Sequence, residues 1–138
     1  MSLANARSAC VSALENISFP NVIVYENQEY KVSQIGPTWL QFFFAPNDPE
    51  VNTLGSLGND RYRGFFQLDI NTQPGDGEAE TFSKYAAMRA VFFAGKELQY
   101  NGTSVLITSC GLSQGRRVDE YYRKSITVFW QTDITRTS

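Results

Sequence analysis

The first apolar pattern along the chain has the spacing of a helix. Apolar residues recur every three or four positions near the start, which places them on one side of a helix. The pattern predicts an amphipathic helix over residues 3–16 that ends before Pro20. Its apolar positions, which can cover one face of a sheet, are Leu3, Ala6, Cys10, Leu14 and Ile17.

A second helix is predicted over residues 77–94. Asp76, in the turn before it, is placed to cap its first turn, and Gly95 is placed to end it. Arg89 falls among the aromatic residues of this helix, so we expect its stem to lie along the apolar surface with its head in water. The aromatic residues expected to share that side are Phe82, Tyr85, Phe92 and Phe93.

Five shorter stretches have the composition of strands, because they are rich in β-branched and aromatic residues. The predicted strands are residues 22–25, 39–44, 66–70, 105–109 and 125–130.

The third of these stretches also alternates between apolar and polar residues, which is the period of a half-buried strand. We expect Phe66, Leu68 and Ile70 to face the core. The polar residues of the opposite face, expected to meet solvent or a partner, are Gln67, Asp69 and Asn71.

Residues 46–60 are dominated by Pro, Asn, Asp and Gly, which predicts a loop. A loop of about fifteen residues is uncommon inside a compact domain and is usually functional or disordered. No linker or internal repeat divides the chain, so we interpret residues 1–138 as one domain. The order α-β-β-β-α-β-β predicts an α+β fold, with a mostly antiparallel sheet of about five strands and both helices on one face.

Charge and hydropathy limit the classes of partner. Twelve basic and fourteen acidic residues give a formal net charge of −2, without the basic excess that binding a phosphate backbone requires. Sequence-specific nucleic-acid binding is therefore disfavoured. No stretch approaches the eighteen or so apolar residues of a membrane span, and the start lacks a leader-like pattern, so we expect a soluble, intracellular product without a membrane partner.

The side chain most often used as an acid or base in catalysis is missing. The sequence has no histidine, which removes Ser-His-Asp and Cys-His arrangements and histidine metal sites. Cys10 and Cys110 are a hundred positions apart and form no metal-binding pair, so we expect free, buried thiols. A calcium-loop spacing from Asp69 to Glu80 has Pro74 where the loop needs glycine. We therefore expect no catalytic residue, cofactor or metal.

Several short segments of the sequence, in their order and spacing, resemble the tail terminator proteins of long-tailed phages. The resemblance covers roughly residues 5–133. None of these segments is a catalytic signature. The segments are residues 22–27, Trp39-Leu40, residues 62–70, Gly75-Asp76-Gly77, the helix with Phe92 and Phe93, and residues 121–128.

The resemblance implies a structural virion protein. Such proteins form a six-membered ring on the end of the completed tail tube, stop its polymerisation and present a surface to the head. The implied partners are other copies of the chain, the tail tube protein and a head-completion or connector protein. The implied location is the tail of the virion, with assembly in the host cytoplasm.

A head-to-tail ring needs two different, complementary patches on each subunit. Phe65 and Phe129 are candidates because each lies on the face opposite the apolar residues of its strand, although a helix or loop could equally cover them. Two charged or polar segments are further candidates, the predicted loop and the turn of residues 111–120, of which the turn could equally be a solvated hairpin. Their candidate contact residues are Asn47, Asp48, Glu50, Asn52, Arg116, Arg117 and Asp119.

Other functions stay open at the level of sequence. A different head-tail connector or a tail tube protein would use a similar small ring subunit. A small-ligand or regulatory domain would instead need an enclosed apolar pocket with a few convergent polar groups. An enzyme acting through a carboxylate or a thiol is the least favoured alternative.

Overall fold

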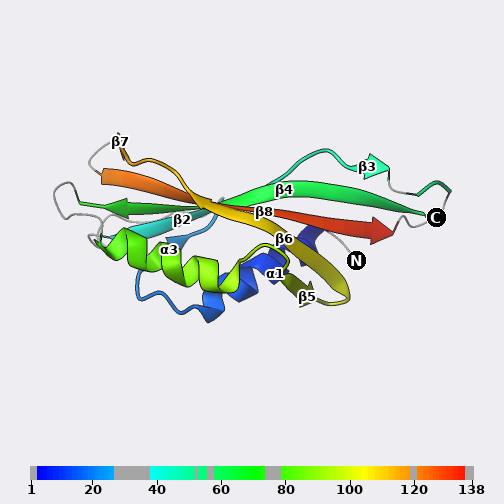
Figure 1. Cartoon of the computed structure of the whole chain (residues 1–138), viewed down its shortest axis with the longest axis horizontal. Coiled ribbons are helices and arrows are strands. Elements are labelled where there is room, and N and C mark those ends of the chain that lie inside the picture. Colours follow the sequence, from blue (N-terminus) through cyan, green and yellow to red (C-terminus); the bar gives the residue numbers. More distant parts are fainter. Residues whose placement is uncertain are drawn as a thin grey trace.

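The computed structural model describes residues 3–26, 38–51, 53–55, 58–73, 79–118 and 121–135. It has an α+β fold in which two helices lie on the same side of a curled sheet (Figure 1), as the sequence predicts. The elements are α1 (Leu3–Asn16), β1 (Val22–Val24), β2 (Trp39–Pro46), β3 (Glu50–Val51), β4 (Asn59–Thr72), α3 (Ala79–Val91), β5 (Glu97–Tyr100), β6 (Thr103–Leu112), β7 (Arg116–Val118) and β8 (Tyr121–Thr135).

The sheet has eight strands in the order β1-β2-β4-β8-β6-β5, with β3 paired to β4 and β7 paired to β8. Every pairing is antiparallel except β1 with β2, which is parallel, so the sheet is mixed. The predicted five strands are all present, and the prediction missed β3, β5 and β7. These have two to four residues each, which is too short for an alternating pattern to stand out.

Two strands are much longer than the sequence indicates. β4 has 14 residues and β8 has 15, and they pair without interruption from Asn59 opposite Thr135 to Thr72 opposite Tyr122. Their apolar segments match the predicted strands, but charged residues such as Arg61 and Asp133 continue the same ladder. The backbone pairing therefore extends well beyond the segment that covers the core.

The core lies between the sheet and the two helices. Phe66, Leu68 and Ile70 are fully buried, as predicted, and Phe92 packs edge-on against Phe66 with ring centroids 5.0 Å apart. Cys10 is buried and Cys110 is half-buried, and both are free thiols. Burial raises the pKa of Cys10 to about 12, so this thiol stays protonated and unreactive at neutral pH.

The prediction that four aromatic residues share one side of the second helix is wrong. Phe82 is half-exposed at 50%, and the helix instead buries Thr81, Lys84 and Met88. Lys84 can be buried because its Nζ lies 2.9 Å from Oε1 of Glu80 one turn earlier, an ion pair that also lowers the pKa of Glu80. The remaining aromatic residues divide between environments: Phe92 is buried, Tyr85 is half-buried and Phe93 is exposed.

On the polar face of β4, predicted to meet solvent or a partner, Gln67 is half-buried, but Asp69 and Asn71 are buried within the subunit. Asp69 is 1% exposed and Asn71 is fully buried. Asp69 Oδ1 accepts hydrogen bonds from Gln67 Nε2 at 2.8 Å and from Ser125 Oγ at 2.5 Å. The same Asp69 pairs with Arg123 at 3.8 Å. On the side of the sheet away from the helices, Asp69 and Asn71 therefore form a buried polar cluster next to Trp39.

Candidate interaction surface

The side of the sheet away from the helices, here called the outer face, carries exposed aromatic residues. Phe65 on β4 lies directly opposite Phe129 on β8, and their ring centroids are 5.9 Å apart. Phe43 on β2 lies opposite Gln67 and shares this face, since partners across a ladder point to the same side. We call Phe43, Phe65 and Phe129 the aromatic patch.

The patch leaves much aromatic surface in contact with water. Phe129 is 47% exposed and Phe43 is 36% exposed, while Phe65 is half-buried between them. Adjacent exposed rings on a soluble protein mark interaction sites more often than single ones do. The structure thus brings the two predicted aromatic residues together. It adds Phe43, which sequence analysis missed although it alternates with the buried Phe42 and the half-buried Phe44.

Beyond the patch, β3 and the ends of β4 and β8 form a projection that we call the arm (Figure 1). Glu50 of β3 pairs with Arg61 of β4, and Val51 pairs with Asp60. The ion pair of Arg63 with Glu50, at 3.1 Å, joins the same two strands. The prediction of one long loop over residues 46–60 is therefore wrong, because part of this segment is a short strand.

The arm exposes apolar side chains at its end. Leu54 is 89% exposed and Val51 is 65% exposed. The predicted contact residues Asn47, Asp48 and Glu50 are exposed in this segment too, and Asn52 lies outside the described residues. Sequence analysis missed Val51 and Leu54 because isolated apolar residues in a polar segment give no pattern.

One hollow joins the arm to the aromatic patch. It has a volume of about 250 Å³, and Asn47 and Phe129 both line it, together with Arg63 and Trp130. Two predicted contact residues that are far apart in the sequence are therefore neighbours on the surface. A hollow of this size suits a side chain of a partner better than a small ligand, whose pockets are usually about 300–1,000 Å³.

The two predicted arginines lie at the other end of the sheet. Arg116 and Arg117 are exposed on β7, a short strand that pairs with the start of β8, and not in an irregular turn. Asp119 falls outside the described residues. Arg116 lies opposite Arg123 and Arg117 lies opposite Tyr122, so that the two arginines point to opposite faces of the sheet.

Within the described residues, no group of three or more Cys, Asp or Glu side chains could hold a metal ion. Neither described helix is long and apolar enough to cross a membrane. The chemistry of this surface is that of contact: exposed rings, exposed aliphatic residues and charges at opposite ends of one sheet.

Comparison with known proteins decides the family. The family model described as "Phage tail terminator protein" matches residues 5–130. The chain belongs to the phage tail terminator protein family. Its place as a structural component of the phage tail follows, and the resemblance seen in the sequence is confirmed.

Other comparisons bear on the fold of this tail terminator family member. No curated protein matches the chain. One solved structure aligns with 97% of this chain and 97% of its own, with a TM-score of 0.78 and 19% sequence identity. At that identity the likeness shows a common fold. The alignment covers nearly the full length of both chains, so this α+β arrangement is shared by both proteins.

Proposed function

We propose that this protein is a tail terminator that forms a six-membered ring on the end of the tail tube. The ring stops polymerisation of the tube and provides the surface on which the head is joined. The match to the tail terminator family over residues 5–130 carries this proposal. The exposed contact features of the sheet support it.

A closed ring of identical subunits requires each copy to meet its neighbours through two different patches. Two candidate patches support this arrangement: the arm and β7 lie toward opposite ends of the sheet (Figure 1), with the aromatic patch near the middle of the β4–β8 ladder. Their different chemistry, apolar at one end and basic at the other, favours a head-to-tail arrangement over a two-fold dimer.

The partners follow from this role. Each subunit meets two other copies, one side of the ring meets the tail tube protein, and the other side meets a head-completion or connector protein. Assembly takes place in the host cytoplasm before the finished tail joins the head. The role needs no catalysis and no cofactor.

The small-ligand alternative receives little support. Three pockets lined by described residues have volumes of about 240–270 Å³, below the usual range for ligand sites. The choice between a terminator and another head-tail connector rests on the family match and is tested by the phenotype of a phage that lacks the protein.

Loss of the protein is expected to leave tail tubes that are overlong or irregular and do not join heads. A tube that lacks its terminator keeps an end to which tube subunits can add. Electron microscopy of lysates from a phage lacking the gene measures this directly, with the wild-type gene supplied in trans as control. Tails of normal, uniform length in the absence of the protein would rule out the terminator function.

The aromatic patch is expected to act in assembly and not in folding. In the double variant Phe43→Ser, Phe129→Ser, the buried part of two rings that are 36% and 47% exposed is lost, so the free energy of unfolding should fall by roughly 2 kcal/mol and the protein should remain folded. Its ability to restore normal tails should nevertheless fall sharply.

The matched control is Phe82→Ser, which removes a ring of similar exposure on the helix side of the sheet. This variant should support normal tail assembly. If the double variant assembled normal tails, or the control failed equally, the patch would not be a specific contact.

A further inference from the structure

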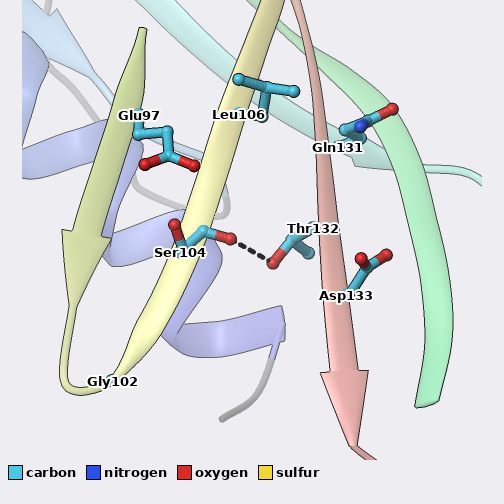
Figure 2. A pocket seen from close by; sticks show the side chains of 7 residues that line it. All are labelled: Glu97, Gly102, Ser104, Leu106, Gln131, Thr132 and Asp133. Atoms are coloured by element: carbon cyan, nitrogen blue, oxygen red, sulfur yellow. Dashed lines mark hydrogen bonds between the residues drawn. The ribbon is translucent and has the colours of Figure 1, made fainter.

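The sheet opens into a furrow on its outer face where β6 and β8 separate. The two strands pair from Leu112 opposite Ile126 to Leu106 opposite Gln131, and beyond that point they diverge (Figure 2). The hydroxyl of Thr132 donates to the carbonyl of Ser104 at 2.7 Å and bridges the gap. The furrow has a volume of about 240 Å³, and we call it the β6–β8 furrow.

Two carboxylates flank this furrow. Glu97 stands on β5 at one side and Asp133 on β8 at the other, with Leu106 and Ser104 between them (Figure 2). Arg61 already binds Asp133 through two hydrogen bonds of 2.9 and 3.2 Å, which raises the pKa of that arginine. Glu97 has no ion pair with any described residue, so no counter-charge is assigned to it within the described part of the subunit.

At the opposite end of the sheet, Arg116 carries a positive charge with no ion pair among the described residues. It lies directly opposite Arg123, and like charges in that position destabilise a pair of strands. Arg123 is occupied: its Nε donates to Asn71 Oδ1 at 2.7 Å, and it pairs with Asp69. The charge of Arg116 therefore weakens the β7–β8 hairpin slightly. No ion pair in the described part of the subunit offsets this effect.

We propose that Arg116 of one copy binds in the β6–β8 furrow of the next copy, between Glu97 and Asp133. The inference rests on the proposed ring and specifies one of its contacts. The charges are complementary, because the furrow offers Leu106 for the aliphatic stem and the Glu97 carboxylate for the guanidinium, while Asp133, already held by Arg61, forms the other side. Its volume lies below the range of small-molecule pockets.

The sheet places the two halves of the contact at different positions, as a head-to-tail arrangement requires. The ladder registers place Arg116, Glu97 and Asp133 on the outer face. β7 and the strand ends that border the furrow, those of β5 and β8, lie toward opposite ends of the long axis (Figure 1). A contact between them uses different patches on the two copies, so it repeats around a ring without change.

The register also supplies an internal control, because Arg117 is the next residue on β7 but points to the helix side. In cells infected by a phage that lacks the gene, we expect Arg116→Glu to reduce the yield of normal tails by about tenfold or more, since a like-charge contact is strongly unfavourable. Glu97→Lys should have a similar effect. Arg117→Glu should have little effect. Thermal melts of the purified variants establish that each is folded.

Restoration by charge exchange identifies the two patches as partners. Co-expression of Arg116→Glu and Glu97→Lys should restore tails, because subunits can alternate around a six-membered ring and every contact then joins opposite charges. The same two changes in one chain should also restore them. Folded single variants that give normal yields would overturn the contact, and so would loss of function without restoration in the mixture.

The phage that lacks the gene is the baseline of this experiment, and its phenotype tests the terminator function separately from the contact. If the phage lacking the gene made normal tails, the terminator function itself would fail. If that phage needed the protein but tolerated every charge variant, the function would stand and this contact would be wrong.

Discussion

Replacing Asp69 by alanine should lower the free energy of unfolding by about 3 kcal/mol or more, because removal of one partner leaves a poorly solvated charge uncompensated. Asp69 is 1% exposed, and the side chain of Arg123 is only 18% exposed. Without the carboxylate, Arg123 keeps its hydrogen bond to Asn71 but loses its counter-charge. Ser125 Oγ loses its acceptor as well.

For a domain of this size, such a loss corresponds to a fall in melting temperature of roughly 10 °C. Thermal and urea unfolding followed by circular dichroism measure it. Asp69→Asn should be less damaging, because its amide oxygen still accepts from Ser125 while the charge is lost. Asp48→Ala, at an exposed aspartate of the arm, is the matched control and should change stability by about 0.5 kcal/mol or less. An equally small effect at Asp69 would show that water solvates this network in the folded protein.

The burial of Asp69 also marks a limit of sequence analysis. Alternation correctly placed Phe66, Leu68 and Ile70 in the core, because the period of a strand fixes which residues share a face. Alternation does not say what covers the other face. Asp69 is buried by long-range contacts with β8, and its partner Ser125 is 56 positions away. A single sequence contains no signal for such a pairing.

The helix was misjudged for a related reason. Counting aromatic residues favoured Phe82 as a core position, but the short α3 turns Lys84 and Met88 toward the sheet. A lysine with a glutamate one turn before it is polar by composition and still packs in the interior. Hydropathy therefore identified the helix correctly while giving the wrong rotation about its axis.

The candidate surface was partly predictable. Phe65 and Phe129 stood out because they interrupt the polar positions of otherwise regular strands, and the sheet register places them side by side. The arm was not predictable, since a two-residue strand such as Glu50–Val51 is fixed by its partner in β4 and not by local preference. The furrow depends on where two strands separate, which is a property of the assembled sheet.

Substituting valine for Gly64 is expected to destabilise the fold by about 3 kcal/mol, at the upper end of the usual cost of overpacking. Gly64 lies on β4 between Pro46 of β2 and Trp130 of β8. A Cβ at this position would lie 2.8 Å from Pro46 Cα and 2.9 Å from Trp130 Cζ2, and closer still to the carbonyl oxygen of Ala45.

The absence of a side chain at Gly64 leaves room for a pair of stacked rings. The rings of Phe44 and Trp130 come from the strands on either side of β4, and they stack with centroids 4.9 Å apart and planes within 5°. Because Phe44 is opposite Phe66 and Trp130 is opposite Gly64, the stack crosses β4 beside the glycine. A methyl group or larger would push against this stack on one side and against the β2 backbone on the other.

Two further variants separate these contacts. Gly111→Ala is the matched control, because a Cβ there meets nothing within 4 Å, and its effect on the melting temperature should be small. Trp130→Leu removes a buried ring and is destabilising by itself, so the double variant is compared with Trp130→Leu alone. Gly64→Val should cost less in that background but still destabilise, since the clash with the Ala45 carbonyl and Pro46 Cα is with backbone and remains. No cost in that background would place the whole clash in the ring contact. A Gly64→Val protein that melts like the wild type would show that β2 moves away from β4 at no cost in stability. The stack of Phe44 on Trp130 would then not determine the positions of the strands at the base of the arm.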